Sequence, residues 1–226
     1  FSSFPDVIAG AEFSDQEKMK RFARSAGWLV IEPDLPGASA TPVFARPGNN
    51  VVFQIAKMLL DPQYVGPGAG PDHNKQKNLI GAKFREDTAW KAPWHFARYG
   101  VVNTHLLASA YRPLRKLKNR KIVNEIVRIM EHHKAVPWFL TMDGNGKPNA
   151  WHLRPLYKAG WTNTHKMGGA LPTHGKRTID YIWFRLSPKV KFVRHYTVQN
   201  GSDHNAIIGE FEISVLPFGW PHLYTS

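Results

Sequence analysis

Short apolar runs that end in turn residues recur along most of the chain, and three longer stretches have helical character. Apolar runs bounded by Gly, Pro, Asn or Asp predict β-strands, which we expect at 6–11, 28–31, 42–45, 51–55, 79–84, 96–107, 137–142, 179–185, 190–198 and 206–214. Helices are predicted at 14–26, where Ser14 and Glu17 have capping-box spacing, at 112–130 and at 149–159. Residues 61–78 are rich in Pro, Gly and polar side chains, which is typical of a long surface loop.

The order of these elements indicates the fold class. The strands do not alternate regularly with helices, as they would in a doubly wound parallel sheet, so the pattern favours an α+β fold. The chain has no internal repeat and no linker marked by a shift in composition. Residues 1–226 are therefore expected to form a single domain.

Composition excludes several kinds of chemistry. The chain contains no Cys, which rules out disulfides, zinc sites built from thiolates and cysteine nucleophiles. No apolar run reaches the roughly 18 residues that a membrane-spanning helix needs, so no membrane span is expected. The chain does not open on a basic segment followed by an apolar stretch, so no signal peptide is predicted. The compartment and the oligomeric state are left open by the sequence.

The net charge of +13 and the pI of about 10.0 favour a polyanionic partner, because such an excess attracts polyanions over long range. A basic surface that serves only solubility is the alternative. One block is especially basic: Arg112, Arg115, Lys116, Lys118, Arg120 and Lys121 occur within ten residues that contain no acid. It lies a few residues after His105, so we expect Arg112, Arg115, Lys116, Lys118 and Arg120 to bind a nucleic-acid backbone beside a site, with a solvated helix face as the alternative.

Polar residues that suit catalysis stand where apolar runs end. These residues are Glu12, His105, Asp143 with Asn145, Asp180, and the run Ser202-Asp203-His204. Strand ends that meet at one edge of a sheet commonly build a site. Carboxylate oxygens suit Mg²⁺ or Mn²⁺, and histidines beside carboxylates can exchange protons or contact phosphate oxygens.

The order of these motifs resembles the endonuclease/exonuclease/phosphatase (DNase I-like) superfamily over nearly the whole chain. The matching stretches are 5–12, Val101-Val102-Asn103-Thr104-His105-Leu106, Phe139-Leu140-Thr141-Met142-Asp143-Gly144-Asn145, Arg177-Thr178-Ile179-Asp180-Tyr181-Ile182 and Gly201-Ser202-Asp203-His204. The resemblance implies a four-layer αββα sandwich of two mostly antiparallel sheets. It also implies a phosphodiesterase that depends on Mg²⁺ or Mn²⁺, with a nuclease as the favoured activity.

The same resemblance implies a role for each candidate residue. Glu12 and Asp203 would bind the metal. Asp143 would orient or activate the attacking water, and Asn145 would position the phosphate. The remaining roles are implied for His105, which would contact the scissile phosphate, His204, which would stabilise its developing charge, and Asp180, which would orient a histidine.

The sequence departs from the family pattern near its start. The family's first strand carries an Asn that supports the metal site, and this chain is expected to begin after that strand. Ala11 stands where Gln is usual, and Asp143-Gly144-Asn145 keeps only the Asp-x-Asn spacing of its motif. Two other functions therefore stay open: a phosphatase of a small phospho-substrate or lipid headgroup, and a degenerate, non-catalytic binding or scaffold domain.

Overall fold

A six-stranded sheet forms the centre of the protein, and most of its strands are antiparallel. The computed structural model describes residues 5–10, 16–31, 42–60, 77–86, 99–108, 112–134 and 136–214. In spatial order the strands of the large sheet are β4 (Asn49–Leu60), β5 (Lys77–Glu86), β6 (Tyr99–His105), β7 (Trp138–Asp143), β9 (Asp180–Arg185) and β8 (Trp161–Asn163). Only β6 and β7 run parallel, and the helix between them makes their crossover.

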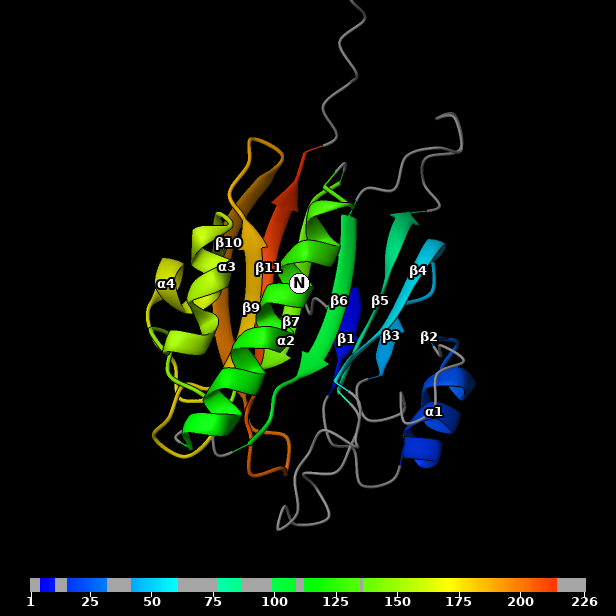
Figure 1. Cartoon of the computed structure of the whole chain (residues 1–226). Coiled ribbons are helices and arrows are strands. Elements are labelled where there is room, and N and C mark those ends of the chain that lie inside the picture. Colours follow the sequence, from blue (N-terminus) through cyan, green and yellow to red (C-terminus); the bar gives the residue numbers. More distant parts are fainter. Residues whose placement is uncertain are drawn as a thin grey trace, which may run out of the picture.

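Helix α2 (Pro113–Glu131) covers one face of this sheet together with a 3₁₀ turn (Trp151–Leu153) and α3 (Arg154–Lys158) (Figure 1). The apolar residues of α2 recur at helical spacing, and Ile122, Val123 and Ile126 are buried against Leu140 and Trp183 of the sheet. Pro113 starts the helix, where its missing N–H is not needed. This layer forms the first of two hydrophobic cores.

The second core lies between the opposite face of the large sheet and a second layer of strands (Figure 1). That layer contains β1 (Val7–Ala9), β3 (Val43–Ala45) and β2 (Leu29–Ile31) in one sheet, and β10 (Val190–Val198) and β11 (Ala206–Ile213) in another. Phe139 and Phe184 of the large sheet pack against Phe211 of β11, with ring centroids 4.6 and 4.9 Å apart respectively. Helix α1 (Gln16–Ser25) contacts β2 on the outside, and α4 (Thr164–Gly168) contacts β10.

The predicted α+β, four-layer αββα sandwich is therefore confirmed. The predicted strands and helices occur with shifted ends, and β4 is longer than the run 51–55 from which it was predicted. Two short elements, β8 and α4, were missed, because three residues of strand and five of helix are too short to show a period. Asn163 joins them: it ends β8, and its side chain accepts a hydrogen bond from the Lys166 N–H and so caps α4. Most of the loop predicted at 61–78 lies outside the described residues.

Among the described residues, no helix is long and apolar enough to cross a membrane.

Candidate active site

Three strands of the large sheet bring polar residues to the same edge. β6 and β7 are parallel and in register, so that His105 lies opposite Asp143. β9 runs antiparallel to β7 and begins at Asp180, which also pairs with Asp143. Three residues predicted from widely separated motifs are thus immediate neighbours across the sheet.

Asp143 organises one half of this edge. Its Oδ1 accepts a hydrogen bond of 2.8 Å from the Asn145 backbone N–H, and its Oδ2 lies 3.3 Å from Nε2 of His105. Asn145 has a left-handed backbone with φ of 45°, which Asn tolerates better than most residues. Its side-chain amide donates to the Leu106 carbonyl at 3.1 Å. The Asp-x-Asn spacing therefore serves a tight turn that fixes both side chains at the end of β7.

Both ring nitrogens of His105 have polar neighbours. Nδ1 lies 3.5 Å from the ammonium of buried Lys77. Nε2 lies 3.3 Å from Oδ2 of Asp143 and 3.2 Å from the side-chain nitrogen of Asn145. His105 is 5% exposed, so it is held as an inner member of the site.

Asp180 and His204 form the other half of the edge. Nδ1 of His204 lies 2.9 Å from Oδ2 of Asp180, and both side chains are partly buried. The hydrogen bond to Asp180 raises the pKa of His204 above its ordinary value; burial opposes the shift, and the negative charges of the neighbouring aspartates add to it. The arrangement favours a protonated ring, whose Nε2–H suits contact with an anion.

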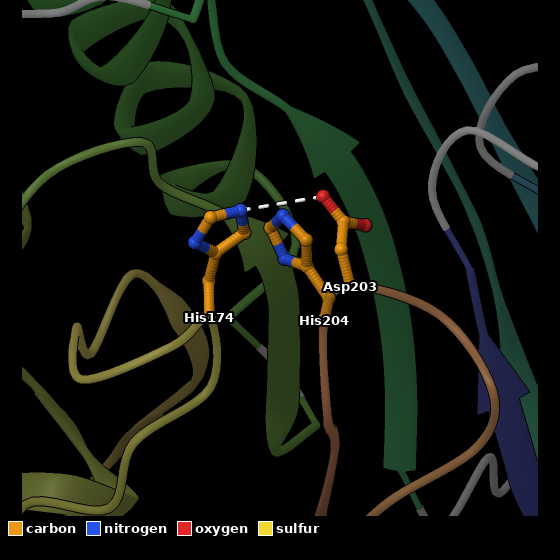
Figure 2. Close-up of side chains that lie close together, drawn as sticks. All are labelled: His174, Asp203 and His204. Atoms are coloured by element: carbon orange, nitrogen blue, oxygen red, sulfur yellow. Dashed lines mark ion pairs between the residues drawn. The ribbon is translucent and has the colours of Figure 1, made fainter.

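A histidine that sequence reasoning missed completes this half (Figure 2). Nε2 of His174 lies 3.3 Å from Oδ2 of Asp203, and its ring meets the ring of His204 edge-on with centroids 4.5 Å apart. Nη2 of Arg177 lies 2.5 Å from Nδ1 of His174. A guanidinium only donates, so Nδ1 accepts and Nε2–H donates to Asp203. The available signal in the sequence was the position of His174, directly before the Arg177–Ile182 motif.

The loop that carries His174 is held by buried Thr173. The Thr173 hydroxyl accepts hydrogen bonds from the backbone N–H groups of Ile179 and Asp180, both at 3.1 Å. The Thr173 carbonyl accepts from the Asn205 N–H at 2.7 Å. The side chain and the backbone of one residue therefore hold the start of β9 and the segment after His204 close together.

Two further buried histidines support the edge in their neutral form. His165 donates from Nε2 to the Asp180 carbonyl and accepts at Nδ1 from the Leu171 N–H. Nε2 of His152 lies 2.9 Å from the Gly144 carbonyl. Burial lowers the pKa of both rings below 6.5, although the backbone hydrogen bonds oppose this shift.

These two histidines predict a loss of stability in mild acid. Because their folded pKa values lie below 6.5, the unfolded chain takes up more protons as the pH falls, so this stability is present above 6.5 and is lost below it. Urea unfolding in EDTA should show a lower free energy of unfolding at pH 5.5 than at pH 7.5. His152→Gln should flatten that dependence, whereas His132→Gln, at the exposed end of α2, should not. Equal slopes in all three proteins would contradict the assignment.

The described donor atoms fit a hard cation. Two groups offer ligand atoms within 4.8 Å of one another: Asp143, Asp180 and His204, and His174, Asp203 and His204. A protonated His204 cannot bind a cation, so the carboxylates are the candidate ligands, and oxygen donors suit Mg²⁺ or Mn²⁺. Asp203 has a side chain that is 79% exposed, which leaves it accessible to a hydrated ion. The predicted metal ligand Glu12 lies outside the described residues.

The predicted nucleic-acid-binding residues lie at the start of α2, and two of them bond to the protein backbone. Arg115 donates from Nη1 to the Ala108 carbonyl at 3.2 Å. The Arg120 guanidinium lies 4.0 Å from the ring centre of Trp151 and donates to its carbonyl at 3.1 Å. These contacts give Arg115 and Arg120 structural partners. The other three predicted residues are Arg112, Lys116 and Lys118, of which Lys116 lies 5.8 Å from the centre of the same Trp151 ring.

The chain is similar to known proteins in its fold but not in its sequence. No family model matches the chain, and no curated protein matches it in sequence. Among solved structures, the catalytic domain of human Nocturnin matches with a TM-score of 0.71 at 13% identity, over 93% of this chain and 82% of that one. An endonuclease/exonuclease/phosphatase from Bacteroides vulgatus matches with 0.66 at 17% identity, over 92% and 85%. D. rerio TDP2 complexed with a single-strand DNA product matches with 0.64 at 12% identity, over 92% and 86%. The chain therefore shares the fold of these structures, the DNase I-like fold that the order of its motifs implies.

Proposed function

We propose that the protein is a divalent-metal-dependent phosphodiesterase that hydrolyses nucleic acid by in-line attack of water. The observation that carries the proposal is two adjacent carboxylate–histidine pairs, Asp143 with His105 and Asp180 with His204, side by side at one sheet edge. Such costly polar groups are placed together where charge must be stabilised during a reaction.

Each residue has a role that its contacts support. Asp143 accepts a proton from, and so orients, the attacking water, while Asn145 and His105 hold the phosphate beside it. His204, protonated through its bond to Asp180, donates to a phosphate oxygen as negative charge develops there. His174 is a positioning residue, since its Nε2 lies close to Asp203 and its ring packs edge-on against His204 (Figure 2).

Glu12 and Asp203 would hold Mg²⁺ or Mn²⁺, which when bound would neutralise charge on the phosphate and the leaving oxygen. The carboxylate chemistry at this edge fits that assignment. The two carboxylate–histidine pairs argue against the alternative of a degenerate scaffold, because burying charged groups costs free energy that a domain without catalysis gains little from.

The net charge of +13 supports a nucleic acid as substrate. Similar folds include D. rerio TDP2 with a single-strand DNA product, but also a mannosyl-6-phosphatase from Bacteroides thetaiotaomicron. A phosphatase of a small phospho-substrate or lipid headgroup is therefore the second candidate. It predicts turnover without nucleic-acid binding.

One assay separates these functions. The protein is incubated with plasmid DNA, single-stranded DNA, RNA, the diester bis(p-nitrophenyl) phosphate and the monoester p-nitrophenyl phosphate, with EDTA, Mg²⁺ or Mn²⁺. We expect metal-dependent cleavage of the generic diester and of at least one nucleic acid, with weaker binding as the salt concentration rises. Hydrolysis of small phosphomonoesters alone would favour the phosphatase, and no hydrolysis under any condition would refute the proposed function.

The metal assignment predicts a specific loss of affinity. Glu12→Gln should weaken Mn²⁺ binding about tenfold or more, since a neutral amide oxygen replaces a charged ligand, and tenfold corresponds to about 1.4 kcal/mol. Titration calorimetry measures the change. Glu17→Gln removes an exposed carboxylate of α1 that pairs with Lys20 and should bind Mn²⁺ as wild type does. Unchanged affinity of Glu12→Gln would rule out Glu12 as a ligand.

A further inference from the structure

A hollow of about 540 Å³ adjoins the candidate active site and shares Asn145 with it. Its other walls include Lys116 from α2, Lys147 from the turn after β7, and Arg177 from the loop before β9. Three cations from three separate segments thus converge on one space. The volume is in the range of pockets that hold small organic ligands.

No carboxylate lines this hollow among the described residues, although carboxylates neutralise cations elsewhere on the surface. Arg194 pairs with Glu210, Lys191 with Glu212 and Arg128 with Glu125, all within 2.9 Å. Lys116, Lys147 and Arg177 have no ion pair of this kind with any described residue. Mutual repulsion makes such a cluster unfavourable unless an anion balances it.

The walls of the hollow are held in place independently of a ligand. The Tyr181 hydroxyl donates to the Gly146 carbonyl, and His152 bonds to the Gly144 carbonyl at 2.9 Å. Trp151, another lining residue, is stacked on Arg120 at 4.0 Å, and its carbonyl accepts a hydrogen bond from the same guanidinium. A preformed wall lowers the entropy lost when a ligand binds.

We propose that this hollow is a second phosphate subsite, in which Lys116, Lys147 and Arg177 bind a phosphate of the substrate next to the one that is hydrolysed. The inference rests on the proposed function, because it places the reacting phosphate at Asn145 and the adjacent edge. Arg177 also contacts His174 of the active site, so Lys116 and Lys147 are the residues that report on the subsite alone. The substrate class is a compound with two neighbouring phosphates, whether successive phosphates of a polynucleotide or those of a small bisphosphate.

Substrates that differ by one phosphate test the subsite. TpT has a single phosphodiester, and pTpT and TpTp add a terminal phosphate on one side or the other. Glucose 6-phosphate and glucose 1,6-bisphosphate form the corresponding small pair. In wild type with Mn²⁺, we expect kcat/KM to rise about tenfold, through KM, for the doubly phosphorylated member of one pair, because a charge-assisted contact contributes about that much.

The double variant Lys116→Ala/Lys147→Ala should reduce this advantage to within about twofold of unity. Lys158→Ala, on the exposed side of α3 and outside the hollow, is the matched control and should retain the advantage. If the dinucleotides show the higher kcat/KM, the second phosphate belongs to a polynucleotide; if the glucose phosphates show it, the second phosphate belongs to a small bisphosphate. An advantage that persists in the double variant, or that is absent in a wild-type protein that cleaves TpT or either glucose phosphate, overturns the subsite.

Binding measured without turnover separates this inference from the proposed function. Calorimetry on Asp143→Asn should show tighter binding of the doubly phosphorylated compound, lost when Lys116→Ala/Lys147→Ala is added. If no substrate is hydrolysed but this difference remains, the proposed function fails and the subsite stands. If all members of the two pairs bind alike, the subsite is refuted whatever the activity.

Discussion

Asp143→Asn and His204→Ala should each lower kcat by about 10²–10³, the usual loss when a preorganised group at a developing charge is removed. The amide in Asp143→Asn keeps the shape of the side chain but replaces one carboxylate oxygen, which faces either the Asn145 N–H or Nε2 of His105, with an NH₂ group that can only donate. It also removes the negative charge that orients water. His204→Ala removes the proton that Asp180 holds on the ring.

Hydrolysis of bis(p-nitrophenyl) phosphate with Mn²⁺ measures both variants, and circular dichroism verifies the fold. Glu212→Gln, which removes an exposed carboxylate of β11, and His132→Ala, at the end of α2, are the matched controls and should keep wild-type kcat. Affinity for a nucleic acid should change little in the active-site variants, since backbone binding depends on the basic surface. Wild-type turnover in a folded Asp143→Asn protein would show that the catalytic edge is wrongly assigned.

Asn119→Ala should lower the free energy of unfolding by roughly 2–5 kcal/mol. The Asn119 side chain is fully buried, accepts from the Leu107 N–H at 2.9 Å and donates to the Leu107 carbonyl at 3.0 Å. Removing the amide leaves both backbone groups buried without a partner, and each costs about 1–3 kcal/mol. Leu107 follows His105 by two residues, so the same change should loosen the end of β6.

Urea unfolding measures this loss, and Asn124→Ala provides the control, since Asn124 is exposed on the same helix. This control measures how the change from Asn to Ala alters helix stability by itself, since Ala has a slightly higher helix propensity than Asn. Asn119→Ala should also reduce kcat beyond what its residual folded fraction explains. If the two variants unfold at the same urea concentration, the Asn119 contacts contribute nothing to stability.

The positions of the site residues could be predicted from the sequence because each stands where a strand ends. His105, Asp143 and Asp180 each follow or open an apolar run, and a strand of alternating or continuous apolar residues has to place its polar end at the edge of a sheet. Pairing then brings them into register, with His105 opposite Asp143 and Asp143 opposite Asp180. The order of the motifs identifies the fold for the same reason.

His174 was missed, since its position before the Arg177–Ile182 motif is the one signal that the sequence carries for it. It lies in a loop, and its role depends on Thr173, whose hydroxyl holds the start of β9 and whose carbonyl holds the segment after His204, and on the contact with Arg177. The contacts of the basic block could not be predicted from the sequence either. Arg120 stacks on Trp151, 31 residues away, while Lys147 and Arg177, outside the block, converge with Lys116.

The sequence by itself determined the α+β class, the strands and helices that are long enough to show a period, and the chemical types of residue at the strand ends. These are properties of neighbouring residues, and hydrophobic spacing carries them. Only the tertiary structure decided which histidine is protonated, which cations have backbone partners and which face the hollow beside Asn145. The charge, burial and hydrogen bonding of a side chain depend on contacts between segments that are distant in the sequence. No local sequence pattern predicts those contacts.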